Sequence, residues 1–385
     1  MDRRKFLRNA NMAMVSVAGG GLLGCMKRPA GAAIAMGMLP VNLPETSCHL
    51  PRVHVSAERE IRTVVGLRPF RPSGFRVAKE MVGEKVVVHN YGHGGGGITL
   101  SWGTSKLAVD LGLPGHVGPV AVLGCGAVGL ATARLVQEAG FDVTIYTKAM
   151  PPETTSNIAG GQWNPVTVYD DGALTPEFSK QFVDAARYAY RRYQIMMDPR
   201  YGIRWMRNYG VSDTSWPAPS HPGRPSLIEG LQPEIKELAP GTHSFGNRFV
   251  RQFDGIIVEP PIYLPAMMTD VRIAGGRIVV REIRNLEEVR AVPEKLVFNC
   301  TGLGAKALFN DAELTPIRGQ LTFLLPQPEV TYATIYENTY MFSRRDGVLL
   351  GGTHEIGDWN LQPDMTTKAA ILAKQAKLFD GMRDC

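Results

Sequence analysis

The chain has 385 residues, enough for two or three domains with a substantial core. Hydrophobic residues make up 44% and charged residues 20%, close to the globular average, which excludes a disordered, collagen-like or coiled-coil protein. The formal net charge of +6 would suit a nucleic acid or an acidic lipid surface, so its distribution along the chain matters.

The amino-terminal 24 residues have the pattern of an export signal. Four basic residues against one acidic residue give them a charge of +3, and residues 9–24 are uncharged. That stretch is shorter than the roughly 20 apolar residues that span a bilayer. The pair Arg3-Arg4 resembles the twin-arginine signal, which predicts export to the periplasm or the outer cell envelope.

Two alternative cleavage sites follow this signal. Leu22-Leu23-Gly24-Cys25 resembles a lipobox, which would make Cys25 the lipidated, membrane-attached first residue of the mature chain. The alternative is cleavage near Ala30-Gly31-Ala32. Removing residues 1–24 leaves a charge of +3 without long basic runs, so a nucleic acid partner is not expected. No later run is long and apolar enough to cross a membrane.

The cysteines and histidines do not predict a metal site. No C-x-x-C pair or metal-ligand spacing occurs, and we expect no disulfide framework. Cys125 and Cys300 lie in apolar contexts typical of small buried side chains. His89 and His93 are four residues apart, but in a glycine-rich segment without an H-E-x-x-H pattern. The remaining cysteines are Cys25, Cys48 and Cys385.

The strongest local pattern begins at residue 120. The apolar run Val120-Ala-Val-Leu predicts a strand, Gly124-Cys-Gly-Ala-Val-Gly129 a glycine turn, and the next stretch a helix to about Glu138. A second strand is predicted over residues 141–146. In this context the G-x-G-x-x-G pattern indicates a dinucleotide site, with Gly124 in the tight turn, Gly126 beside the pyrophosphate and Gly129 at the helix–strand contact.

The residue that usually holds the adenosine ribose departs from the pattern. Tyr146 is followed by Thr147 and Lys148 instead of an acidic residue, which could indicate NADP. A second loop, residues 154–165, is rich in hydroxyl side chains and glycine and suits the longer ligand FAD.

Several motifs together resemble the D-amino-acid oxidase family of flavoproteins. They are residues 154–165, Phe298-Asn-Cys-Thr-Gly302, Pro316-Ile-Arg-Gly-Gln320, Gly66-Leu-Arg-Pro-Phe-Arg-Pro72 and residues 89–102. The last two resemble the family's carboxyl-terminal signature, yet here they precede the dinucleotide motif. The resemblance therefore implies a circular permutation, which is tolerated where the original termini lie close together.

The resemblance implies roles for individual residues. Arg68 and Tyr340 would hold the substrate carboxylate, Tyr336 would stand on the lid side of the pocket, and the Gly95 carbonyl would face the amine. Gly96 replaces an aromatic residue, which predicts a looser or reshaped pocket floor. The implied FAD contacts are Gly124, Gly126, Gly129, Thr154, Thr155, Ser156, Gly161, Gln162, Gly94, Gly97 and Thr99.

We therefore expect an α/β fold with a Rossmann-like FAD-binding domain and a substrate domain built on a mixed or antiparallel sheet. The FAD domain is predicted at 62–166 and 255–315, and the substrate domain at 167–254 and 316–385, after a signal at 1–24 and a linker at 25–61. The basic, aromatic segment 178–197 is predicted as an amphipathic surface helix.

The implied activity is oxidative deamination of D-amino acids by hydride transfer from Cα to flavin N5, without a side-chain base, giving a 2-oxo acid and ammonia. Oxidation of glycine, sarcosine or another secondary amine is a near alternative, and a noncatalytic envelope flavoprotein is a third. The electron acceptor can be O₂ or a membrane acceptor, and no pattern selects an oligomeric state.

Overall fold

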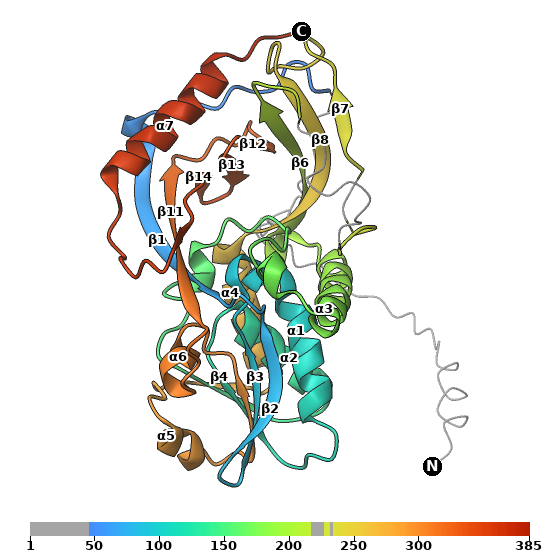
Figure 1. Cartoon of the computed structure of the whole chain (residues 1–385), viewed down its shortest axis with the longest axis vertical. Helices are drawn as coiled ribbons and strands as arrows, with labels where there is room; N and C mark the ends of the chain where they lie inside the picture. The colour runs from blue at the N-terminus through green and yellow to red at the C-terminus, as the bar shows by residue number, and fades with distance from the viewer. Residues whose placement is uncertain (1–45, 217–226, 232–233) are drawn as a thin grey trace, which may run out of the picture. The chain divides into compact units, whose positions relative to one another are not determined.

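Two β-sheets organise the part of the chain that the computed structural model describes, residues 46–216, 227–231 and 234–385 (Figure 1). The described residues belong to one compact unit. The predicted signal at 1–24, Cys25 and Ala30-Gly31-Ala32 lie outside them.

The smaller sheet contains the predicted dinucleotide unit. Its order among the described strands is β2-β3-β10-β4-β5-β9, with β2 antiparallel to β3 and the other neighbours parallel. Every residue of β4 and β5 is buried, as expected of parallel strands covered on both faces. The strands are β2 (Arg76–Val82), β3 (Lys85–Tyr91), β4 (Val120–Leu123), β5 (Val143–Thr147), β9 (Arg277–Val280) and β10 (Leu296–Asn299).

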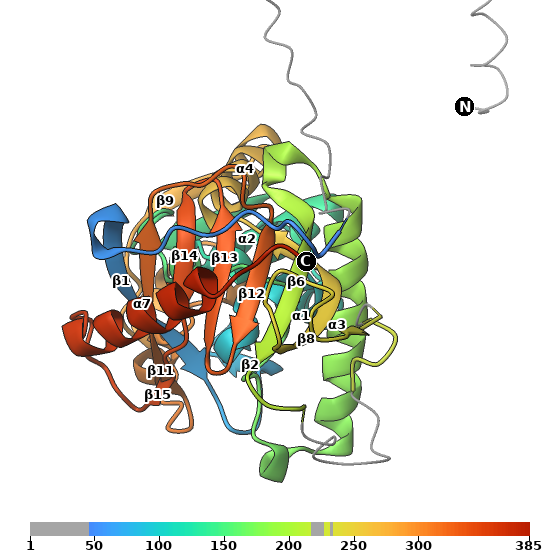
Figure 2. The ribbon, with the colours of Figure 1, turned by 90° about the horizontal axis from the view of Figure 1, so that it is seen from above.

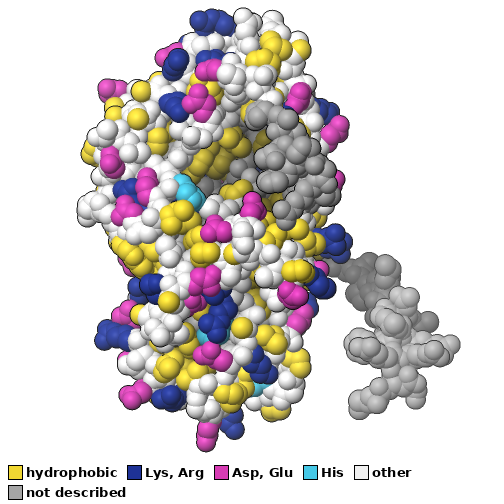
Figure 3. Space-filling model, viewed as in Figure 1, with side chains coloured by type: hydrophobic (Ala, Val, Ile, Leu, Met, Phe, Trp, Pro, Cys, Tyr) yellow, Lys and Arg dark blue, Asp and Glu magenta, His cyan; other side chains and the backbone are white. Residues whose placement is uncertain are grey.

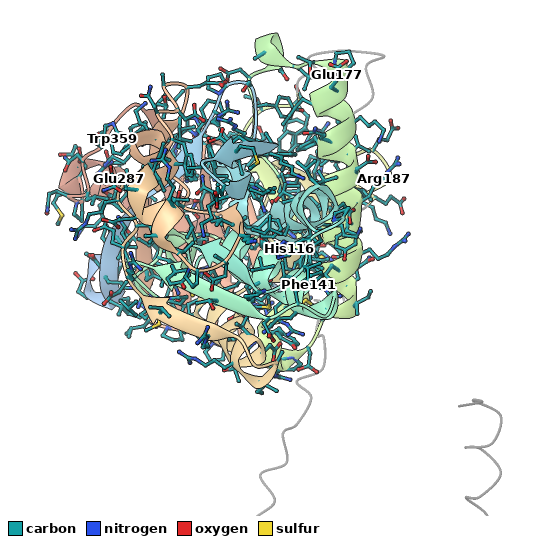
Figure 4. All side chains as sticks on the ribbon, turned by 90° about the horizontal axis from the view of Figure 1, so that it is seen from below. His116, Phe141, Glu177, Arg187, Glu287 and Trp359 are labelled. Atoms are coloured by element: carbon teal, nitrogen blue, oxygen red, sulfur yellow. A yellow bond between two sulfur atoms is a disulfide. The ribbon has the colours of Figure 1, made fainter. Side chains whose placement is uncertain are left out.

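Helices cover this sheet. In the order of packing, α3 (Pro176–Ile195) contacts α1 (Gly97–Gly112), which contacts α2 (Ala127–Glu138), which contacts α4 (Pro260–Ile273). The short helices α5 (Leu286–Ala291) and α6 (Gly304–Leu308) precede and follow β10. The prediction of an amphipathic surface helix is confirmed by α3. Phe182 and Tyr193 are buried on one side, and Arg187 projects outward on the other (Figure 4).

The larger sheet is mixed, as predicted. Among the described strands its order is β1-β11-β14-β13-β12-β6-β8-β7, with β15 also on β11, and β12–β6 is its parallel pair. Helix α7 (Met365–Asp380) packs on β13 and β14 and crosses the strands in Figure 2. The strands are β1 (Glu60–Phe70), β6 (Ile203–Ser212), β7 (Lys236–Leu238), β8 (Phe249–Val258), β11 (Thr315–Leu324), β12 (Tyr332–Tyr336), β13 (Thr339–Arg344), β14 (Gly347–Gly351) and β15 (Glu355–Ile356).

Two predicted domain boundaries do not follow the sheets. Strand β1 falls in the predicted FAD segment 62–166, yet it pairs with β11 along its length. Strand β8 runs through the boundary at 254/255 and pairs with β6 in the larger sheet. Sequence pattern could not show this, because a strand's partner is chosen by tertiary packing. The division into an FAD and a substrate domain stays a prediction.

The expectation of no disulfide framework is wrong at one pair. Cys48 and Cys385 form a disulfide with a Cα–Cα distance of 5.3 Å, across 337 positions of sequence. Spacing along the chain gave no sign of it, because the fold brings the two segments together. Cys125 and Cys300 are free and buried, as predicted.

No helix within the described residues is long and apolar enough to cross a membrane.

Candidate active site

A cavity of about 780 Å³ is lined by segments of both sheets. On the face seen in Figure 3, the surface over the larger sheet is hollowed and hydrophobic side chains lie in the hollow. Most of the predicted site residues line the cavity. They are Arg68, Tyr340, Gly94, Gly95, Gly97, Thr99, Gly124, Gly126, Thr154, Thr155, Ser156, Gly161 and Gln162.

The glycine turn after β4 has the geometry that the motif predicts. Gly124 adopts a φ of +104°, and a Cβ there would lie 2.5 Å from the Cys300 carbonyl oxygen. Gly129 does not line the cavity. A Cβ there would lie 2.0 Å from the Gly124 carbonyl oxygen. Gly129 therefore serves the close contact between helix and turn. The N-cap of α2 is Gly126, which has no side chain, so among its first residues the Ala127 N–H is bound by Ser156 and the helix amino terminus still faces the cavity.

The second loop closes onto this turn. Ser156 Oγ accepts a hydrogen bond from the Ala127 backbone N–H at 3.1 Å, at the start of α2. Further along, Gln162 Nε2 donates to Asn208 Oδ1 at 2.7 Å, which ties the loop to β6 of the larger sheet. The loop thus spans the cavity from the phosphate end toward the larger sheet.

The glycine run at 94–97 forms another part of the wall and begins α1. Its position 96 has no space for a side chain, since a Cβ would lie 2.7 Å from Val168 Cγ2. The Gly95 N–H donates to the Thr167 carbonyl at 3.1 Å, and Thr167 adopts a φ of +56°. Segment 166–168 therefore packs against the run, and Gly96 itself does not line the cavity. The looser or reshaped pocket floor stays a prediction.

Arg68 and Tyr340 come together on the larger-sheet side. Arg68 lies on β1, and a Cβ on Gly319 of the paired strand β11 would be 2.5 Å from its Nη2, so glycine makes room for the guanidinium. Its Nη1 donates to the Thr353 carbonyl at 3.4 Å. Burial raises the pKa of Tyr340, while the nearby Arg68 charge opposes that rise. The phenol is therefore protonated at neutral pH and available as a donor.

Tyr336, expected on the lid side of the pocket, does not line the cavity. The β12–β13 register pairs Ile335 with Tyr340, and Ile335 lines the cavity. Successive side chains of a strand point to opposite faces, so the Tyr336 ring packs on the other face of the sheet, in a cluster with Leu350 and Phe379. Its hydroxyl donates to Oδ2 of the half-exposed Asp213 at 2.7 Å. Burial and Asp213 raise its pKa to about 12.

The sequence did not single out some residues that line the cavity. Thr301 belongs to the quoted Asn-Cys-Thr-Gly motif, and both its N–H and its hydroxyl donate to Asn299 Oδ1, at 3.2 and 2.7 Å. His354 follows β14 beside Arg68, and burial together with the Arg68 charge lowers its pKa. No motif signalled His354, because the end of β14 reaches the cavity only through strand pairing.

Burial shifts the pKa values of two thiols and one histidine on the cavity wall. Burial raises the pKa of Cys125 and of Cys300 to about 12, so both remain thiols. His93 is buried against Thr104 at 2.8 Å, and burial lowers its pKa to about 3. Within the described ranges, no group of three or more His, Cys, Asp or Glu side chains could hold a metal ion.

The fold and this site define a flavin-dependent oxidoreductase, and comparison with known proteins agrees. The family model described as "DAO: FAD dependent oxidoreductase" matches residues 17–111 and 119–385. The chain therefore belongs to the DAO family of FAD-dependent oxidoreductases.

Individual proteins similar to this chain are named as amino-acid oxidases. A D-amino-acid oxidase of Rubrobacter xylanophilus is 32% identical over 267 residues, covering 68% of this chain and 77% of that protein. A human D-aspartate oxidase is 28% identical over 262 residues, covering 66% and 74%. The glycine oxidase structure from Geobacillus kaustophilus has a TM-score of 0.51 at 14% identity, covering 69% and 80%, and shows the fold alone.

The residues present fit FAD, the cofactor of this family. The turn at 124–126 and the α2 amino terminus suit the pyrophosphate, and the loop carrying Gly161 and Gln162 runs on toward Arg68 and Tyr340. When bound there, FAD supplies the two-electron acceptor that no side chain can supply.

Proposed function

We propose that this enzyme catalyses the oxidative deamination of D-amino acids to 2-oxo acids and ammonia. The observation that carries the proposal is the pairing of Arg68 and Tyr340 on the wall of the same cavity as the glycine turn. Relatives named D-amino-acid oxidase and D-aspartate oxidase support it.

The two side chains would bind the substrate carboxylate. A guanidinium presents two parallel N–H donors to a carboxylate, and Arg68 keeps a fixed position because Gly319 lies beneath it and Thr353 accepts from it. The protonated Tyr340 hydroxyl adds a third donor. Together they would hold the amino acid by one end, so that its Cα–H has one orientation.

The proposed mechanism uses no carboxylate as a base, in keeping with the position of the carboxylates on the cavity wall. Among the described residues, the carboxylates that line it are Glu153 and Glu282, and both follow strands of the smaller sheet. Neither lies on the strands that carry Arg68 and Tyr340. Positioning of the substrate, with the carbonyl of Gly95 as acceptor for the amine, would then be the protein's contribution to catalysis.

The test is spectroscopic. The purified, FAD-loaded protein is mixed without oxygen with single D-amino acids, their L-enantiomers, glycine and sarcosine, and loss of the oxidised flavin absorbance is followed. We expect bleaching by D-amino acids; bleaching by glycine or sarcosine alone would favour the secondary-amine alternative, and none at all a noncatalytic role. Readmitting O₂ or adding a quinone then identifies the acceptor.

Arg68→Ala should lower kcat/KM for the best substrate by at least about a hundredfold, because each hydrogen bond to a charged group contributes roughly 1.5–3 kcal/mol. Arg62→Ala is the matched control on the same strand, since Arg62 is exposed and pairs with Asp346 at 3.1 Å. Unchanged turnover in Arg68→Ala would overturn the proposed carboxylate site.

We further propose that the chain is exported by its Arg3-Arg4 signal, with lipidation at Cys25. The Cys48–Cys385 disulfide supports an oxidising compartment, because such bonds persist outside the reducing cytosol. Mass analysis of the mature amino terminus tests it. A lipidated Cys25 is expected, and an unmodified terminus at Ala33 would contradict lipidation.

We also propose that the fold is circularly permuted. The family model matches in two segments that meet near residues 111–119, and the Rubrobacter relative aligns over 267 residues that leave about a quarter of it unmatched. The disulfide holds Cys48, near the start of the described chain, at a Cα–Cα distance of 5.3 Å from Cys385, and such proximity is what rejoining the two segments requires. A variant that starts at Pro119, joins 385 to 46 through a short linker and ends at Gly118 should fold and retain FAD.

A further inference from the structure

A group of charged residues lines the cavity where the smaller sheet ends, and the site described above does not use it. Lys148 follows β5, and Arg281, Glu282 and Arg284 follow β9. Glu153 is the other carboxylate of the wall. This is the end at which the sequence lacks the acidic residue expected for the adenosine ribose.

The strand order gives the direction in which the cofactor extends. Strands β4, β5 and β9 are parallel neighbours, and the pyrophosphate site lies at the amino terminus of α2, directly after β4. The adenosine therefore passes the carboxyl end of β5 toward that of β9. At the end of β5 stands Lys148, whose ammonium cannot accept a hydrogen bond from a ribose hydroxyl.

Glu282 places a carboxylate beside that position. Thr147 of β5 is in register with Val280 of β9, and the Arg281 N–H donates to the Thr147 carbonyl at 2.8 Å. Glu282 is thus the first carboxylate beyond the paired strand ends. Its Oε2 accepts from Arg284 Nε at 3.1 Å, and its side chain is 44% exposed, so it is accessible to a ligand.

Glu153 is less suited to the same task. It directly precedes Thr154, Thr155 and Ser156, the loop that returns to the α2 amino terminus. Glu153 is therefore close in the chain to the expected pyrophosphate site, where a carboxylate would repel the phosphates, whereas Glu282 follows β9, on the far side of β5 from β4.

We propose that Glu282, which follows β9, accepts hydrogen bonds from the adenosine ribose hydroxyls of FAD, and that Arg284 holds its carboxylate in position. Glu282 would replace the carboxylate that ordinarily follows the second strand of the unit, which is β5 here. The ribose-binding carboxylate would then follow β9 instead of its neighbour β5. The proposal rests on the FAD family and the strand register, and it does not depend on the substrate.

The test measures cofactor retention. Wild type and Glu282→Ala are each loaded with FAD or with FAD lacking the adenosine 2′-hydroxyl, diluted, and followed by the rise of free flavin fluorescence. Glu282→Ala should release FAD about tenfold faster than wild type, as expected for losing one hydrogen bond to a charged group. Wild type should release the deoxy analogue faster than FAD, and the variant should release both at similar rates.

Glu287→Ala is the matched control, since Glu287 on α5 is exposed and does not line the cavity (Figure 4). It should release FAD at the wild-type rate. Arg284→Ala keeps the carboxylate and should accelerate release by a smaller factor. Release from Glu282→Ala within twofold of wild type, or equal acceleration for both ligands, would overturn the proposal. A thermal unfolding curve of each holoprotein confirms that the variants are folded.

Discussion

The two sheets present their functional groups in different ways. On the smaller sheet, the site consists of backbone at glycine turns and a helix amino terminus, and the residues required for it follow one another along the chain. On the larger sheet, Arg68, Gly319 and Tyr340 belong to three strands that pairing brings together. Backbone sites leave a motif in the sequence, whereas side-chain sites assembled across strands depend on register.

The largest effect is expected where two backbone segments touch. Gly129→Ala would set a methyl group against the Gly124 carbonyl oxygen, where the unrelaxed contact is 2.0 Å. We expect a loss of about 3 kcal/mol or more in unfolding free energy and little bound FAD after purification. Gly172→Ala, with nothing within 4 Å of its Cβ, is the control. A Gly129→Ala protein with full FAD content would show that this side of the molecule is less rigid than the geometry implies.

The next effect concerns the larger-sheet side alone. Replacing Cys48 and Cys385 by serine should lower the unfolding free energy by about 2–5 kcal/mol, because the bond closes a long loop in the unfolded chain. Chemical denaturation with and without dithiothreitol measures it. The reductant should destabilise wild type and leave the double variant unchanged; equal destabilisation of both would point to another reducible group.

The two tyrosines test the register directly. Tyr340→Phe should lower kcat/KM by about tenfold, because it removes the proposed donor to the substrate carboxylate. Tyr336→Phe removes the donor to Asp213 and should instead lower the unfolding free energy by about 1 kcal/mol, with kcat/KM within twofold of wild type. Steady-state kinetics and urea unfolding on both variants decide it. The reverse pattern would restore Tyr336 to the pocket.

The smallest effect is a pH dependence. His93 has a pKa near 3 when folded and an ordinary pKa near 6.5 when unfolded, so between those values the unfolded chain binds more protons. Stability should fall as pH falls, by up to about 1.4 kcal/mol per pH unit from this group. Urea unfolding from pH 7.5 to 6, where this group contributes less than about 1 kcal/mol, should show a steeper decline in wild type than in His93→Gln. Parallel curves would mean that His93 does not carry the dependence.

The sequence by itself determined the FAD unit, since Gly124, Gly126 and Gly129 are required by local backbone geometry that neighbours in sequence create. Through the family resemblance it also predicted Arg68 and Tyr340 as site residues, and both line the cavity. It could not place Tyr336, because a one-residue choice of register decides which face of β12 meets the cavity. The sheet membership of β1, the Cys48–Cys385 bond and the position of His354 likewise arise from contacts between distant segments. Those contacts are set by packing of the whole fold, so only the tertiary structure decided them.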